Sequence, residues 1–448
     1  MIALGFCLLA FLLTYWAGSK SLGKGIVVLL AFGYSYGILR ANLLTTAAHF
    51  IFDAGVLGLY LSQFVSSKRQ KAAPISTALN YWVIILILWP TLVILMPFQP
   101  LMVSLVGFRS ITLFIPVLLL GARLRDKDLV EICWALVALN LIAAGFAGAE
   151  YVLGLTRFYP ISPVTMIIYA SGDITGGFFR IPATFINAHA YGSTMVFSLP
   201  FLLAFWNRLR NRYLRGLVVL SILAALVGVL MAAARLSFAM AAVAVIASIF
   251  TTRMSTGRRV TFLLVLGGLA VFTLGQERLQ RFKSLGDTEY VSDRIAGSVN
   301  RTFFEILTEH PMGNGLGGGG TAMPYFLQGE IRNPIGMENE YAMILAEQGV
   351  VGFLFWVGFI VWYLTRAGTA FAKGPWDNAR RIGWCTAAFS IATAWIGIGV
   401  FSSIPATTLL LLAMGFTSVP PAVEPRAAGD RRTIPPLRYR RAPVPSVS

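Results

Sequence analysis

The feature that most constrains this chain is a series of thirteen apolar runs, each close to the length of a membrane-crossing helix. An α-helix needs roughly 20 apolar residues to cross the hydrocarbon core of a bilayer. Charged residues, Gly, Pro or Asn mark the ends of each run. The runs cover approximately 2–18, 25–40, 44–65, 78–97, 101–122, 129–150, 190–207, 216–234, 236–252, 260–276, 341–365, 382–400 and 404–419. The pattern predicts an all-α, polytopic transmembrane bundle of about 12–13 helices, with twelve if two early runs form one re-entrant unit.

Composition supports a membrane protein and argues against both an ordinary soluble enzyme and a soluble nucleic-acid-binding protein. Hydrophobic residues make up 57% of the chain and charged residues 12%, whereas soluble domains are about 25% charged. A net charge of +17 would suggest nucleic acid in a soluble protein. Here the basic residues cluster between apolar runs, so no nucleic-acid partner is expected. The three cysteines lie far apart without paired metal spacing, so we expect no metal site and no disulfide.

The distribution of Lys and Arg predicts an orientation. Alternate connections and the C-terminal tail together hold 25 of the 36 basic residues, and short loops rich in such residues stay in the cytoplasm. The C-terminus is therefore predicted to be cytoplasmic. Four regions follow: ten transmembrane helices over 1–276 with an outer loop at 151–189, a large outer loop subdomain at 277–340, three helices over 341–419, and a disordered basic tail at 420–448.

Three arginines on the predicted outer side are candidates for binding an anion. Arg235 lies between two apolar runs, where the chain must turn tightly, and Arg180 and Arg294 lie in the two outer loops. A guanidinium group presents a planar fork of donors that suits phosphate. The alternatives are snorkelling of Arg235 to the membrane interface and a local ion pair of Arg294 with Asp293 or Glu289.

The glycine-rich segment 310–320 contains a formal GxGxxG match, but no strand precedes it and no βαβ unit surrounds it, so it does not predict dinucleotide binding. The glycines instead allow positive φ and close approach to a ligand or another backbone, and a flexible loop is the alternative.

Polar residues cluster just before the eleventh apolar run. A carboxylate there is a candidate general base toward a sugar hydroxyl, although an acid in a first helical turn also compensates the helix dipole. Glu347 lies within the run, where an ionisable group usually faces a cavity or a partner. His189 and the pair His49 and Asp53 are expected to be hydrogen-bonded structural residues, and a proton relay is the alternative for the pair. The candidates for lining a cavity are Asn339, Glu340, Tyr341, Glu347 and His189.

Taken in order, these stretches resemble the O-antigen ligase and polysaccharide polymerase family of bacterial inner-membrane proteins. The resemblance is sharpest from about 179 to 355 and rests on short motifs. They are Arg180 to Gly192 (RIPATFINAHAYG), Ala234 to Ser237 (ARLS), Asp293-Arg294, His310 to Gly317 (HPMGNGLG), Glu338 to Tyr341 (ENEY) and Glu347 to Gly349 (EQG).

The resemblance implies a metal-independent glycosyltransferase without a cofactor. Its partners would be an undecaprenyl-pyrophosphate-linked oligosaccharide, an acceptor glycan, membrane lipids and other polysaccharide assembly proteins. By motif match Arg235 and Arg294, joined by Arg180, would bind the pyrophosphate. The family's loop histidine, proposed to activate the acceptor, falls on Glu338 here, which leaves His310 as the other candidate base and favours a polymerase over a ligase. The competing class is a polysaccharide transporter or flippase, which would also be polytopic.

Overall fold

The computed structural model describes residues 1–67, 76–170, 180–251, 260, 267–268, 288–294, 296–297, 302–320, 323–337, 339–397 and 399–421. This part of the chain is helical and contains no strand. The predicted all-α class is therefore confirmed, whereas the tenth expected run (260–276) and the basic tail lie almost entirely outside the described residues.

The helices that cover the predicted runs follow them closely. They are α1 (Ile2–Lys20), α2 (Leu22–Asn42), α3 (Ile51–Ser67), α4 (Thr77–Val93), α5 (Leu101–Thr112), α6 (Val117–Ala122), α7 (Asp126–Leu153), α9 (Ala188–Arg208), α10 (Arg212–Met231), α11 (Arg235–Thr251), α15 (Glu340–Thr365), α17 (Asp377–Thr393) and α18 (Ala406–Ser418). Short elements connect them: η1 (Thr46–Phe50), η2 (Leu155–Arg157), α8 (Pro163–Ala170), α13 (Thr288–Arg294), α14 (Thr302–Glu309), η5 (Tyr325–Glu330) and α16 (Ala367–Ala370).

Eight helical spans in the described residues are long and apolar enough to cross a membrane, and three shorter apolar helices, α4, α11 and α18, accompany them. Side chains on α1 show where lipid would lie, because Leu8, Leu12 and Trp16 are exposed while Ala10 and Ala17 are buried. A helix that leaves large apolar side chains uncovered needs an apolar solvent on that side. The chain is thus a membrane protein.

Several predicted runs are not single straight helices. In the run 341–365 the backbone of α15 leaves helical geometry at Gly349, which has φ +69°. The run 101–122 breaks into α5 and α6 around Pro116, whose ring removes a backbone donor from the helix. The run 382–400 becomes α17, which starts earlier at Asp377 and ends at Thr393. The apolar sequence continues past Thr393, but the backbone turns there into a loop that contains Gly397 and Gly399, the latter at φ +99°. Apolar composition alone does not mark such a turn.

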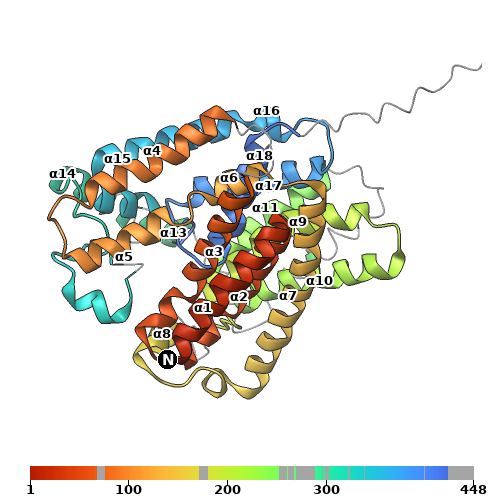
Figure 1. Cartoon of the computed structure of the whole chain (residues 1–448), viewed down its shortest axis with the longest axis horizontal. Coiled ribbons are helices and arrows are strands. Elements are labelled where there is room, and N and C mark those ends of the chain that lie inside the picture. The colour runs from red at the N-terminus through yellow and green to blue at the C-terminus, as the bar shows by residue number, and fades with distance from the viewer. Residues whose placement is uncertain are drawn as a thin grey trace, which may run out of the picture.

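The helices pack through small residues. A Cβ atom added to Gly415 on α18 would lie 2.0 Å from the carbonyl oxygen of Leu118 on α6, and one added to Gly58 on α3 would lie 2.4 Å from that of Phe11 on α1. Such close backbone approach is typical of helix packing in membranes. In Figure 1 α4 and α15 also run side by side.

The connections at one end of the bundle contain residues 154–170, 180–187, 302–320, 323–337 and 339, and we call this end the loop face. Figure 1 places α8 and the N-terminus at this end and α16 at the opposite end. The side chain of Asn42, the last residue of α2, donates to the carbonyl oxygen of Phe158 at 3.2 Å. This bond holds the end of α2 against the first of these connections.

Candidate functional site

Residues 180–187, called here the crossing segment, run over the helix ends at the loop face. The backbone N–H of Ile181 donates to the carbonyl oxygen of Met231 at the end of α10 (3.3 Å), and Ile38 of α2 donates to the carbonyl oxygen of Thr184 (3.1 Å). The N–H of Ala183 donates to Oε2 of Glu150 near the end of α7 (2.9 Å). Three helices therefore fix this segment, and it delivers Arg180 and His189 to a defined place.

Arg180 is a buried cation at the start of the crossing segment. Its side chain is 7% exposed, and its Nη1 lies 2.7 Å from Nε2 of His189 in the first turn of α9. Its Nε atom is buried without a hydrogen-bond partner. Within the described part of the chain no carboxylate pairs with Arg180. A buried charge normally requires a counter-charge, so the site favours an anion.

Arg235 begins α11 directly after the tight turn that ends α10. In that turn Ala233 has φ +47°, and in the crossing segment Ala183 has φ +50°. An L-residue in this left-handed region costs about 1–3 kcal/mol, and such strain concentrates at functional sites. Strained backbone therefore lies near both arginines.

Small residues bring the starts of α9 and α11 together. A Cβ atom added to Gly192, one turn beyond His189, would lie 3.1 Å from Oγ of Ser237 and 3.2 Å from Cβ of Ala232. Since Ile181 is bonded to Met231, Arg180 and His189 lie at the same edge of the loop face as the turn that carries Arg235. We call these three residues the arginine edge.

Two predicted site residues cannot be placed with their side chains. Arg294 is the last residue of α13, and nothing is described of its side chain. Glu338, the predicted base, lies outside the described residues. The other candidate base, His310, follows α14 and is half-buried, and its carbonyl oxygen accepts a hydrogen bond from Gly313 N–H at 2.8 Å.

The glycine-rich segment is shaped around a carboxylate of this chain. Gly313, Gly315, Gly317 and Gly320 have φ between +69° and +82°, as their sequence predicted. The N–H groups of Gly317 and Gly319 donate to the carboxylate of Glu347, which is 2% exposed. The partners of this ionisable residue are thus two backbone N–H groups of the glycine-rich segment.

Glu340 has a similar structural role in the first turn of α15. Its Oε2 accepts from the N–H groups of Gly399 (2.6 Å) and Val400 (3.2 Å), and its Oε1 accepts from that of Phe401 (3.3 Å). The side chain is fully buried. It thereby ties α15 to the loop between α17 and α18. On the other side of that loop, a Cβ atom added to Gly397 would lie 3.0 Å from Leu236, which neighbours Arg235.

The two neighbours of Glu340 also have structural partners. Asn339 caps α15, since its Oδ1 accepts from Ala342 N–H at 2.6 Å. The phenol of Tyr341 donates to the carbonyl oxygen of Ile391 at 2.7 Å. These contacts position the start of α15 against the end of α17.

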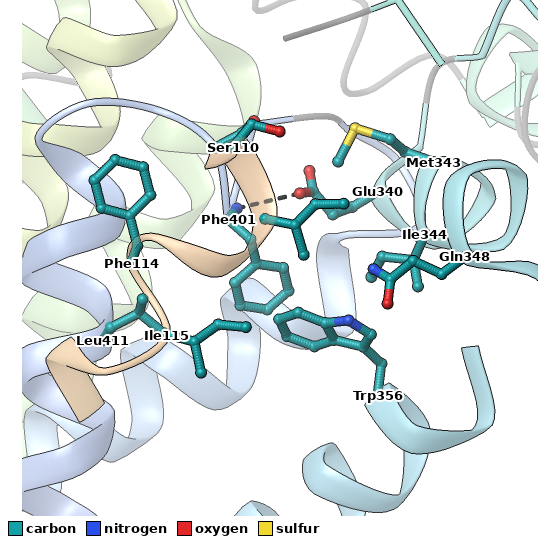
Figure 2. A pocket seen from close by; sticks show the side chains of 12 residues that line it. Ser110, Phe114, Ile115, Glu340, Met343, Ile344, Gln348, Trp356, Phe401 and Leu411 are labelled. Atoms are coloured by element: carbon teal, nitrogen blue, oxygen red, sulfur yellow. Dashed lines mark hydrogen bonds between the residues drawn. The ribbon is translucent and has the colours of Figure 1, made fainter. Parts of the chain in front are cut away.

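A small cavity of about 30 Å³ lies between α5, α15, α18 and the loop before α18. Figure 2 shows Glu340 at its upper edge, with the side chains of Gln348 and Trp356 opposite. Nε2 of Gln348 and Nε1 of Trp356 are buried without hydrogen-bond partners. Because the volume suffices for about one or two water molecules, we expect water to satisfy these donors.

Replacing Glu340 by Gln tests its structural role. The amide keeps one acceptor oxygen, so at least one buried N–H group of the 399–401 loop loses its partner, at a cost of about 1–3 kcal/mol. We expect a lower apparent Tm in nanodiscs. Glu330→Gln on η5, where the side chain is exposed, is the matched control and is expected to change stability by less than about 0.5 kcal/mol. Equal Tm values for the two variants would contradict the assignment.

One buried ion pair joins a residue singled out in the sequence to a partner that was not predicted. Asp53 on α3 was expected to bond to His49, but both its oxygens accept from Arg109 on α5, at 2.5 Å from Nε and 2.8 Å from Nη2. Helical spacing brought His49 and Asp53 to one face, yet the bidentate fork of an arginine on another helix is the stronger partner. Only the tertiary packing shows which arginine that is.

Among the described residues no group of three or more His, Cys, Asp or Glu side chains is placed to hold a metal ion. The metal independence inferred from the family resemblance stays a prediction. Comparison with known proteins found neither a matching family model nor a matching curated protein.

Proposed function

We propose that this protein transfers a glycan from an undecaprenyl-pyrophosphate carrier to an acceptor sugar hydroxyl at the loop face, as a polysaccharide polymerase. The proposal carries forward the motif resemblance. It is supported chiefly by one observation, the buried Arg180 guanidinium that contacts His189 and has no acidic partner in the described residues.

The chemistry requires a stabilised leaving group. The acceptor oxygen forms a bond to the anomeric carbon, the bond from that carbon to the pyrophosphate oxygen breaks with its electron pair, and a base takes the hydroxyl proton. Negative charge therefore grows on the pyrophosphate. Preorganised cationic donors in a partly dry site stabilise such charge most effectively, and Arg180 and Arg235 at the arginine edge supply them. Arg294 is the third proposed cation.

The proposed base is Glu338, with His310 as the alternative. Glu340 and Glu347 are poorer candidates for the base, because their buried carboxylates already accept backbone hydrogen bonds. A base needs a free acceptor within reach of the substrate hydroxyl.

The location follows from the same proposal. The loop face would be the outer face of a bacterial inner membrane, with the C-terminus in the cytoplasm. Transfer to lipid A-core, as in an O-antigen ligase, is the closest alternative activity. A transporter or flippase without transferase activity is the alternative class, and the buried Asp53 and Arg109 pair within the helices is the observation that favours it.

Replacing Glu338 by Gln tests the base. If Glu338 accepts the proton, the amide variant should lose at least about 100-fold in transfer rate while its Tm stays unchanged. His310→Gln should then retain most activity. The reverse pattern, with an active Glu338→Gln and an inactive His310→Gln, would move the role to His310.

The proposed activity is tested with purified protein in lipid nanodiscs, supplied with undecaprenyl-pyrophosphate oligosaccharide from its host and EDTA, without nucleotide sugar. A ladder of lengthened lipid-linked glycans is the expected product. A single transfer to an added acceptor would identify a ligase. Unchanged substrate with a folded, substrate-binding protein would refute the transferase and leave transport as the hypothesis.

A further inference from the structure

A second group of basic side chains lies at the loop face and shares no residue with the arginine edge. It comprises Arg40 near the end of α2, Arg109 on α5 and His49 of η1, with the phenol of Tyr36 between them. The phenol of Tyr36 interacts electrostatically with both guanidinium groups, and its O–H donates to the carbonyl oxygen of His49 at 2.7 Å. We call Arg40, Arg109, His49 and Tyr36 the α2 cluster.

The charges of the α2 cluster do not balance. Asp53 neutralises Arg109 through two hydrogen bonds of 2.5 and 2.8 Å, whereas Arg40 has no ion pair among the described residues. The Nε atom of Arg40 is buried without a hydrogen-bond partner. The guanidinium group of Arg40 thus lacks a counter-charge where little water is available, and repulsion from Arg109 adds to the cost.

Simple snorkelling does not explain this arrangement. A snorkelling arginine extends its guanidinium toward water and headgroups. Arg40 instead lies close enough to Arg109 for electrostatic repulsion and interacts with Tyr36, whose side chain is 3% exposed. The remaining edge of Arg40 is partly accessible, so an external anion can reach it.

The large connection before α15 supplies the other wall. Tyr325 on η5 interacts electrostatically with Arg40, and the rings of Tyr325 and Phe326 lie 6.3 and 5.5 Å from that of His49. A phenol, an imidazole and a guanidinium group therefore lie near one another. These are donors that recognise phosphate oxygens.

We propose that the α2 cluster is a second anion site, which binds a phosphate group at the loop face through Arg40. The ligand class is a phosphate ester of a lipid headgroup or free phosphate, which share this chemistry. A bound phosphate would supply the counter-charge that Arg40 lacks. The site is independent of the proposed transfer, because it uses none of the residues of the arginine edge.

The test compares wild type, Arg40→Gln and Arg157→Gln in detergent micelles. Arg157 is an exposed arginine of η2 on the same face, so its variant controls for surface charge. Three probes are titrated separately: inorganic phosphate, phosphatidylglycerol, and undecaprenyl phosphate. Binding is followed by thermal shift and, for the lipids, by native mass spectrometry of retained molecules.

We expect Arg40→Gln to weaken binding at least tenfold for one class of probe, whereas Arg157→Gln binds like wild type. Loss confined to the lipids identifies a headgroup site, and loss of inorganic phosphate binding identifies a site for the free ion. Equal binding by all three proteins would overturn the proposal. If Arg40→Gln does not fold, Arg40→Lys replaces it and should also bind more weakly, because a lysine lacks the planar fork; unchanged binding by Arg40→Lys would likewise overturn it.

Discussion

Replacing Arg180 or Arg235 by Ala is expected to lower glycan transfer by about 100-fold or more, the effect typical of removing one donor that stabilises transition-state charge. Arg180 should show the larger loss. Its guanidinium is buried, and a charge acts more strongly where water is excluded, whereas Arg235 is only half-buried. The measurement is the initial rate of glycan lengthening in nanodiscs at saturating lipid-linked substrate.

The control is Arg212→Ala. Arg212 begins α10 as Arg235 begins α11, but it lies at the opposite end of the bundle and is exposed. Its replacement should leave the rate unchanged. Ala variants of Arg180 and Arg235 that fold and keep wild-type rates would remove the arginine edge from the mechanism.

Gly37→Ala is expected to have the largest structural effect. A Cβ atom at Gly37 would lie 1.9 Å from the carbonyl carbon of Phe185 and 2.4 Å from the backbone nitrogen of Ile186. Because both atoms belong to the backbone, the crossing segment must move as a unit. Overpacking of this kind costs about 1–3 kcal/mol, and the displacement carries Arg180 away from the arginine edge. We expect a lower apparent Tm and loss of transfer.

Gly216→Ala provides the matched control for that substitution. Gly216 lies in α10, and nothing stands within 4 Å of its added Cβ atom. Ala is the better helix former by about 1 kcal/mol, so stability should be equal or higher. If Gly37→Ala matched wild type in both Tm and activity, the close packing of α2 against the crossing segment would be disproved.

The sequence predicted the helices well because membrane burial acts on long segments. A bilayer selects about 20 apolar residues whatever their detailed order, so α2, α7 and α9 lie where the apolar runs do. The ends were less predictable. The turn after Thr393 depends on the carboxylate of Glu340, which lies far away in sequence.

The candidate site was predictable only in part. The arginines stood out because charges are rare in an apolar chain, and the positive φ of the glycines followed from their lack of a side chain. The contact between Arg180 and His189 has no periodic signal, since a non-helical segment separates the two. The bonds of Glu347 to Gly317 and Gly319 likewise join distant parts of the chain.

The α2 cluster also could not be predicted from the sequence. Arg40 and Arg109 lie in different apolar runs, and each alone resembles a helix-end arginine that reaches the interface. Their common interaction with Tyr36 arises only in the folded chain. A charge imbalance of this kind is a property of the tertiary structure.

The most direct test of the proposed transfer is the stoichiometry of carrier release. Wild-type protein in nanodiscs with EDTA is given lipid-linked oligosaccharide, and free undecaprenyl pyrophosphate is counted against new glycosidic bonds. A glycosyltransferase of the proposed type releases one carrier for each bond formed. A folded protein that binds this substrate but releases no carrier and forms no bond would contradict the proposed function.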